Sequence, residues 1–495
     1  MRGIVMNEKL QIAFGLLGGL AIFIYGMNMM SECLQKAAGE KMKSILALLT
    51  KNPLLGVLAG AVTTAVLQSS SATTVMAIGF VSAGLMSLPQ AISIIFGANI
   101  GTTMTAQIIA FKISDYIYII IFIGFIIAFV TKSEKIKSIG QTIFAFGLLF
   151  LGIETMGDVM KPLASSPVFT DLIGKVAHIP VLGVGVGTLM TLVVQSSSAT
   201  IAVLQNFAAQ PGADGMTSIL GLAGAIPILL GDNIGTTITA LLASIGQSKD
   251  AKRTAVAHCI FNISGCFLFI WFVKPFAALI QYISPKGPEI EVISRQIANA
   301  HTVFNITMTL IWVCLINVMV KIVMTLIPDG KSKEIDPARP LYLDEKIISQ
   351  PTAALQLVAK EILHLSDMVK EAVKDTISIV KTEETSRMNA LTEKGHQIKT
   401  LADRITEYLA LLFSSGTMTE QQASQTASLM YVLSDVERIG TLSVEIAGCI
   451  QEKADHQYKY TEEAMDELQK SLKTLEKMFR SEERRVGKEC RSRWS

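Results

Sequence analysis

The stretch QSSSATT, residues 68–74, places a glutamine and three consecutive serines in the middle of an apolar region. No Asp, Glu, Lys or Arg occurs from Asn52 through Phe111. Inside a bilayer core, polar groups and non-helical backbone persist only where protein, water or a ligand satisfies them. The cluster is therefore a candidate for holding a ligand within the membrane.

The motif returns as QSSSATI at residues 195–201, 127 positions later. Each copy is followed by a second shared element, GANIGTT at 97–103 and GDNIGTT at 231–237. Glycines and a threonine at equal spacing also precede both copies. The chain therefore contains a duplicated unit, which we place at residues 10–131 and 138–274.

Charge divides the chain into two parts. Residues 1–330 carry 33 charged side chains, whereas the remaining 165 residues carry 51. The first part suits a multi-pass membrane protein, whose helices need about 20 apolar residues per span. The second part, from 351 to 479, spaces its apolar residues as a soluble bundle of long helices does. The predicted fold is thus all-α, with a final transmembrane segment at 275–327 and a linker at 328–350.

The apolar segments outside the motifs predict spans at 11–31, 88–111, 115–131, 139–158, 221–246, 254–273 and 299–327. Each QSSS segment is then either one long span or a re-entrant hairpin with its tip at QSSS. Hairpins give three spans per repeat and an inverted second copy, whereas full spans give four and a parallel copy. We favour hairpins, because each arm has only about 12–15 residues and inverted repeats with broken helices recur in transporters.

Basic residues indicate the orientation. Three short loops gather them, Lys36–Lys51, Lys132–Lys137 and Lys249–Arg253. Such loops face the cytoplasm in multi-pass proteins of the plasma membrane. This places the C-terminal domain in the cytoplasm and the N-terminus outside.

A hairpin tip at QSSS has a defined chemistry. The helix that follows would start near Ser70 or Ser197, so its free N–H groups and positive dipole end would attract an anion. Oxygen ligands for alkali cations would come from Gln68, Gln195, Asn99, Asn233, Thr102 and Thr236. The alternative is that small polar residues only permit close helix packing. Two copies in matched contexts favour the ligand site.

The paired QSSS motifs, each followed by G-x-N-I-G-T-T, resemble the type II sodium–phosphate cotransporter family, including its bacterial members. The resemblance covers residues 10–327 and implies sodium-driven secondary transport of inorganic phosphate, with sodium as the coupling ion and no other cofactor. No nucleophile–base pair or P-loop points to an enzyme, and nothing points to a nucleic-acid partner. The candidate substrate and ion site is Gln68, Ser69, Ser70, Ser71, Thr73, Asn99, Thr102, Thr103, Gln195, Ser196, Ser197, Ser198, Thr200, Asp232, Asn233, Thr236 and Thr237.

Further polar residues in the apolar part have two interpretations each. AVAHCIFN (255–262) and ANAHTVFN (298–305) share A-x-A-H-x-x-F-N, for which we favour hydrogen bonding between helices over a pathway lining. Asp232 replaces the Ala98 of the first repeat, and it either completes a sodium site or caps a broken helix. The simpler interpretation of Glu154 is a structural role, and that of the GxxxG at Gly183–Gly187 is helix packing.

The C-terminal part resembles the PhoU family of phosphate-signalling proteins at 398–413 and 430–448. Glu437 is followed by Thr441 where PhoU proteins often have a second acid, so only a regulatory or docking role is carried over. A cytoplasmic regulatory partner or self-association would act through this domain. The alternative function is that of a membrane protein that senses phosphate without transporting it and signals through the PhoU-like domain.

The last residues, 480–495, break the helical pattern before them. They resemble a translated sequencing adapter, so we exclude them from the fold and expect the natural domain to continue further.

Overall fold

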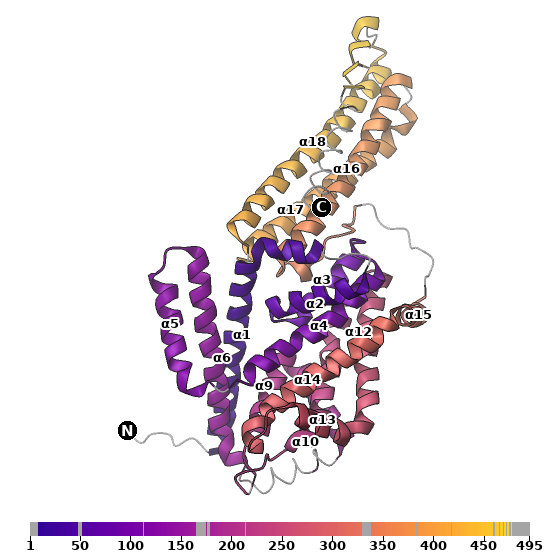
Figure 1. The fold of residues 1–495 in the computed structure, drawn as a ribbon. Helices are drawn as coiled ribbons and strands as arrows, with labels where there is room; N and C mark the ends of the chain where they lie inside the picture. The colour runs from indigo at the N-terminus through magenta and orange to yellow at the C-terminus, as the bar shows by residue number, and fades with distance from the viewer. Residues whose placement is uncertain are drawn as a thin grey trace. The chain divides into compact units, whose positions relative to one another are not determined.

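The computed structural model describes residues 8–47, 52–111, 113–164, 175, 179–212, 214–328, 338–382, 385–416, 418–458 and, with short gaps, 461–477. The predicted non-native tail lies outside the described residues, as do residues 329–337 of the predicted linker. Contacts divide the chain into two compact units, Met1–Asp329 and Gly330–Ser495, whose helices are labelled in Figure 1. Within the described ranges both units are helical. The first unit, Met1–Asp329, contains both QSSS motifs and is called the membrane unit below.

Within the described ranges, six segments are long and apolar enough to cross a membrane: Leu10–Leu34, Leu88–Ile109, Ile136–Met160, Gly221–Ser244, Lys249–Ile283 and Glu289–Cys314. They lie in α1 (Glu8–Ala47), α4 (Leu88–Ile109), α6 (Glu134–Ala164), α10 and α11, α12 with α13, and α14. The predicted span at 115–131 corresponds to α5 (Ile117–Val130), which has only 14 residues. At 1.5 Å per residue, such a helix spans about 21 Å, less than a hydrocarbon core.

Both QSSS motifs break a helix at the position that the sequence predicts. The first separates α2 (Pro53–Leu67) from α3 (Ser70–Ser82), and the second separates α8 (Pro180–Val194) from α9 (Ser197–Ala208). The glutamine of each motif has a left-handed backbone, with φ of 52° at Gln68 and 54° at Gln195, and this conformation ends the preceding helix. All four arms have 12 to 15 residues.

The serine after each glutamine starts the next helix. Ser69 and Ser196 are N-caps with extended backbones. Their side-chain oxygens accept from the N–H of Ala72 and of Ala199, each at 3.2 Å. A serine N-cap satisfies one of the free N–H groups of the first turn. The motif thus contains both the stop and the start signal, which is why both breaks could be predicted.

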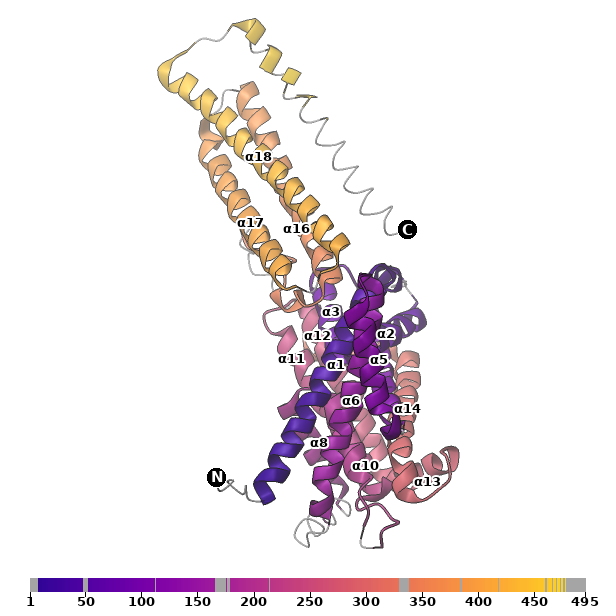
Figure 2. The ribbon, with the colours of Figure 1, turned by 90° about the vertical axis from the view of Figure 1, so that its left-hand side faces the viewer.

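The two repeats run in opposite directions. Their first helices, α1 and α6, pack along each other, as the two views in Figures 1 and 2 show. A Cβ at Gly15 would meet Val159, whereas a Cβ at Gly26 would meet the carbonyl oxygen of Ala145. Residue numbers rise along one helix as they fall along the other, so α1 and α6 are antiparallel. Because these are equivalent helices of a duplication, the repeats are inverted, as predicted.

Glycines bring the broken helices into backbone contact with the helices that carry NIGTT. A Cβ at Gly97 would lie 1.9 Å from the carbonyl oxygen of Val57, which joins α2 to α4. A Cβ at Gly187 would lie 1.9 Å from the carbonyl oxygen of Ile228, so the backbones of α8 and α10 (Gly221–Gly235) are in contact there. The GxxxG at 183–187 is therefore a packing motif, consistent with its simpler interpretation.

We expect Gly187→Ala to prevent assembly of the second repeat, because the added methyl group meets backbone rather than a movable side chain. Overpacking typically costs about 1–3 kcal/mol, and a backbone clash costs more. Folded, detergent-stable protein measured by size-exclusion chromatography should fall strongly. Gly185→Ala is the matched control in the same helix, since nothing lies within 4 Å of its added Cβ. Equal yields of the two variants would contradict this packing.

The last helices differ from the predicted single spans. The predicted span 254–273 lies mostly in α12 (Lys249–Phe269), which follows α11 (Thr237–Ser244). α12 ends at a short 3-10 turn, Ile270–Phe272, and α13 (Val273–Ile283) follows. Pro275 lies in the first turn of α13, where a missing N–H is tolerated. The predicted span 299–327 is divided at Leu315 between α14 (Glu289–Cys314) and α15 (Ile316–Leu326). No glycine or proline lies at that division, so composition gave no signal for it.

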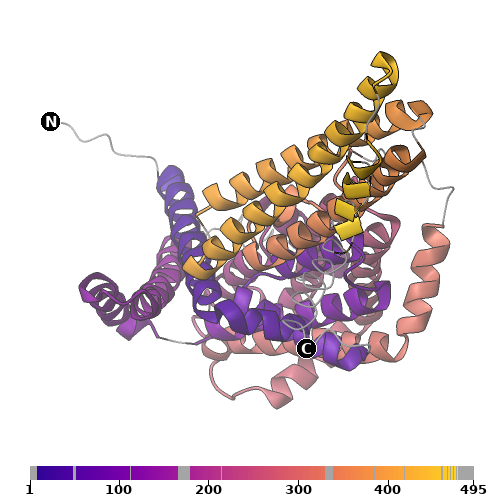
Figure 3. The ribbon, with the colours of Figure 1, turned by 90° about the horizontal axis from the view of Figure 1, so that it is seen from above.

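Up to His456, the described part of the C-terminal unit is a bundle of three long helices, which lie side by side in Figures 1 and 3. They are α16 (Pro351–Thr382), α17 (Met388–Ser414) and α18 (Glu420–His456), and all three lie within the range 351–479 that the sequence predicts to be helical. The fully buried carboxylate of Glu361 accepts from the N–H groups of Leu341, Tyr342 and Leu343. The end of the predicted linker is therefore folded onto the bundle.

Candidate substrate and ion site

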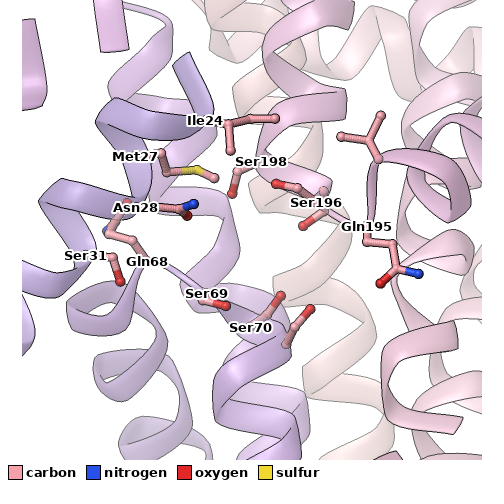
Figure 4. Close-up of a pocket in the computed structure, with 13 residues that line it drawn as sticks. Ile24, Met27, Asn28, Ser31, Gln68, Ser69, Ser70, Gln195, Ser196 and Ser198 are labelled. Atoms are coloured by element: carbon pink, nitrogen blue, oxygen red, sulfur yellow. The ribbon is translucent and has the colours of Figure 1, made fainter. Parts of the chain in front are cut away.

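The two QSSS tips meet at one cavity of about 260 Å³ in the membrane unit. Figure 4 shows the serines of both tips around it, with Gln68 and Gln195 at opposite edges. The lining residues come from α1 and from both tips: Ile24, Met27, Asn28, Ser31, Gln68, Ser69, Ser70, Ser71, Val194, Gln195, Ser196, Ser197 and Ser198. Eight of the predicted site residues are thus brought together from positions 127 apart in the sequence.

Two helix N-termini open onto this cavity. The first intrahelical hydrogen bond of α3 runs from the N–H of Thr73 to the carbonyl of Ser69, and that of α9 runs from Thr200 to Ser196. The N–H groups of Ala72 and Ala199 bond the serine caps. Those of Ser70, Ser71, Ser197 and Ser198 lie ahead of the first intrahelical bond, in the turn that has no intrahelical acceptor. The cavity therefore has the donors and the positive dipole ends that bind an anion.

The residues that line the cavity carry no charged side chain. An oxyanion there would find hydroxyl groups, amides and helix dipoles, but no arginine or lysine. Charge compensation for a multiply charged anion would have to come from a bound cation. The site therefore favours joint binding of an anion and a cation over binding of an anion alone.

Sequence reasoning missed the contribution of α1. Asn28 and Ser31 line the cavity, and the Ser31 hydroxyl donates to the carbonyl of Leu67, the last residue of α2. This contact holds the end of the first broken helix against α1. Polar side chains within an apolar span were the available signal, but the repeat motifs gave no reason to join them to the tips.

The polar residues of the NIGTT elements do not line the cavity. The side-chain oxygen of Asn99 lies 3.4 Å from His258 Nε2, and that of Asn233 lies 3.3 Å from His301 Nε2. The A-x-A-H-x-x-F-N motifs thus form interhelical hydrogen bonds, as we favoured. The threonine hydroxyls donate to backbone carbonyls three or four residues earlier, which applies to Thr102, Thr103, Thr236 and Thr237.

Asp232 lies behind the second tip and is fully buried. Its Oδ1 accepts from the hydroxyl of Thr191 at 2.7 Å, and that hydroxyl is 3.1 Å from the hydroxyl of Thr200. Its Oδ2 is buried and has no hydrogen-bond partner within the described parts of the chain. A carboxylate in an apolar interior needs a cation or a proton.

The first repeat has the same two threonines without the acid. Thr64 donates to Thr73 at 2.9 Å, and Ala98 stands where the second repeat has Asp232. Asp232 therefore makes the polar surroundings of the two tips unequal. Glu154, the other acid singled out in the sequence, has a buried Oε2 without a partner among the described residues and is not part of the cavity lining.

Comparison with protein families identifies both parts of the chain. Residues 22–158 and 156–284 match the family model described as Na+/Pi-cotransporter, and together they cover more than half of the chain. Residues 362–450 match the PhoU domain. No solved structure matches the chain significantly.

Individual relatives agree with this assignment. The uncharacterized protein YqeW of Bacillus subtilis is 34% identical over 266 residues, which are 54% of this chain and 84% of that protein. YjbB of Salmonella typhimurium, proposed by its name to export inorganic phosphate, is 24% identical over 92% of this chain and 81% of its own length. Sodium-dependent phosphate transport protein 2A of Rattus norvegicus is 36% identical over 97 residues, 19% of this chain and 15% of that protein.

Inverted repeats with paired QSSS tips, six apolar segments of spanning length and matches to both family models lead to one conclusion. The chain is a multi-pass membrane protein of the Na+/Pi-cotransporter family with a C-terminal PhoU domain.

Proposed function

We propose that this chain transports inorganic phosphate across the plasma membrane with sodium as the coupling ion, and that phosphate binds between the N-termini of α3 and α9. The observation that carries the proposal is the shared cavity, where Ser69–Ser71 and Ser196–Ser198 face one ligand-sized space. Phosphate oxygens are suited to the N–H groups at helix N-termini. The serine hydroxyls supply additional donors that can rotate toward the ligand.

Sodium coupling is supported by the charges around the site. The cavity has no cationic side chain, so a bound phosphate needs a counterion. The unpartnered Oδ2 of Asp232, with the hydroxyls of Thr191 and Thr200 nearby, offers hard oxygen ligands to such a cation. The predicted cation ligands Gln68 and Gln195 remain candidates at the cavity. Asn99 and Asn233 would need to leave their histidine partners to take part.

The membrane arrangement is part of the same proposal. We take α2–α3 and α8–α9 as re-entrant hairpins, because arms of 12 to 15 residues reach about 18–22 Å and cannot cross the bilayer alone. Inverted repeats make them enter from opposite faces and meet at mid-membrane. The basic residues at 36–51, 132–137 and 249–253 support a cytoplasmic C-terminal domain.

The PhoU match favours one alternative function. A membrane protein that binds phosphate at the tips without moving it could signal through the PhoU domain. Both functions use the same cavity, so only flux separates them.

Radiolabelled phosphate uptake into proteoliposomes separates the two functions. The transport function predicts accumulation with an inward sodium gradient and none with an equal potassium gradient. Preloaded vesicles with an outward sodium gradient test export in the same preparation. Sodium-dependent phosphate binding in detergent, together with no flux in either direction, would contradict transport and leave the sensor.

A further inference from the structure

The two tips have the same sequence but different surroundings. Gln68 is buried, with 8% of its surface exposed, whereas its counterpart Gln195 is exposed. The end of α2 packs on α1, whereas in the second repeat α6 packs on α9. Because both tips read QSSSAT, the difference arises from tertiary arrangement rather than from the tip residues themselves.

One threonine fixes the side chain of the buried glutamine. Thr105 on α4, itself buried, donates its hydroxyl to Gln68 Oε1 at 3.0 Å. The Gln68 Nε2 donates to the carbonyl of Ala65. Both polar ends of this cavity residue are thus occupied, and its orientation is set by Thr105.

The equivalent threonine of the second repeat has a different partner. Thr239 on α11 follows Asn233 by six positions, as Thr105 follows Asn99. Its hydroxyl lies 3.3 Å from the hydroxyl of Ser71, at the tip of the other repeat, and 2.9 Å from the carbonyl of Thr236. Among the described residues, no threonine bonds the side chain of Gln195 in this arrangement.

The contacts of the buried asparagines and histidines do not differ between the repeats. The contacts between asparagine and histidine on the same helices are nearly equal in the two repeats, at 3.4 and 3.3 Å. Asn262 and Asn305 also make the same bond, each to the carbonyl of the histidine four residues earlier. The asparagines of NIGTT are therefore held alike in the two repeats, while the glutamines of the tips are not. The helix that carries NIGTT is continuous in the first repeat and divided at Thr236 in the second.

We propose that Thr105 and Thr239 are positioning residues that exchange partners during transport. In the present arrangement Thr105 bonds Gln68 and Thr239 bonds Ser71. In the exchanged arrangement Thr239 bonds Gln195 and Thr105 bonds Ser198, the symmetry-related pairs. In the present arrangement Thr105 holds Gln68 buried while Gln195 is exposed. In the exchanged arrangement Thr239 would hold Gln195 buried while Gln68 is exposed. This inference rests on the proposed function, in which an inverted-repeat transporter alternates between two arrangements.

A fixed asymmetry is the competing explanation. Gly157 stands where the first repeat has Ser31, so the second tip lacks one contact that the first tip has. If such differences alone bury Gln68, the glutamine stays buried throughout and the exchanged arrangement does not form. The two explanations differ in whether Gln68 ever becomes accessible.

Thiol labelling of the purified full chain in proteoliposomes distinguishes them. Gln195→Cys and Gln68→Cys are each reacted with a water-soluble thiol reagent, and labelling of the parent chain, with its six cysteines, is subtracted. The exchange predicts labelling at both positions. Thr105→Val should slow labelling of Cys introduced at 195 by about twofold to fivefold. The present arrangement loses the bond to Gln68 at 3.0 Å, whereas the exchanged arrangement loses only a weaker contact, of the kind that Thr239 makes with Ser71 at 3.3 Å, so the shift is less than one full hydrogen bond of about 0.5–1.5 kcal/mol.

The reciprocal pair tests the symmetry. Thr239→Val should slow labelling at position 68 by a similar factor, whereas Thr105→Ser and Thr239→Ser, which keep the hydroxyl group, should restore the parent rates. Absence of labelling at position 68, or valine variants that react like the serine variants, would overturn the exchange. These outcomes are independent of flux. If the parent chain takes up phosphate with sodium but position 68 is not labelled, the exchange is contradicted and the proposed function is not.

Discussion

Replacing Ser70 and Ser197 together with alanine is expected to lower sodium-driven phosphate uptake at least about 100-fold, while the protein still reaches the membrane. The two residues open α3 and α9 and line the shared cavity. Each hydroxyl that bonds a charged ligand contributes about 1.5–3 kcal/mol, and the double variant removes two. The N-caps Ser69 and Ser196 are unchanged, so both helices still start at the same positions.

The matched control is Ser93→Ala with Ser244→Ala. These two serines are also buried, but they donate to carbonyls of their own helices, at Pro89 and Leu241. Uptake by this control should stay within a small factor of the parent rate. Near-normal uptake by the tip variant, measured at matched protein density, would remove the tips from the phosphate site.

Asp232→Asn is expected to raise the sodium concentration for half-maximal uptake at least about tenfold or to change the charge moved per phosphate. The substitution keeps the size and the bond from Thr191 but removes the negative charge that a buried cation needs. Loss of one member of a buried ion pair costs about 3–5 kcal/mol. Sodium titrations of uptake and of transport current in proteoliposomes measure both quantities.

Asp115→Asn is the control for this variant, because Asp115 is an exposed carboxylate in the membrane unit. It should leave the sodium titration unchanged. If Asp232→Asn also leaves the titration and the current per phosphate unchanged, Asp232 is a structural residue that holds the arms of α8 and α9 through Thr191.

The breaks at the two tips could be predicted because their causes are local. Gln68 and Gln195 end helices and Ser69 and Ser196 cap the next ones, so a seven-residue motif contains the geometry. Inversion of the repeats could be predicted as well, since it follows from counting apolar segments once the tips are taken as hairpins. The duplicated motif then indicated that the tips would meet, and the cavity brings them together.

Other features depend on tertiary contacts and gave no local signal. Asn28 and Ser31 reach the cavity only because α1 packs against the end of α2. The division at Leu315 has no helix-breaking residue. The unequal burial of Gln68 and Gln195 cannot be predicted from identical motifs, because it depends on the helices that pack against each tip.

The central claim is that phosphate binds between the two tips. Its most direct test is a cryo-electron microscopy structure of the full chain in sodium phosphate, compared with one in sodium chloride. The account predicts density for one tetrahedral anion within hydrogen-bond distance of the first turns of α3 and α9, in the phosphate sample only. A cavity that stays without such density at phosphate concentrations that saturate binding, or an anion bound elsewhere, would contradict the account.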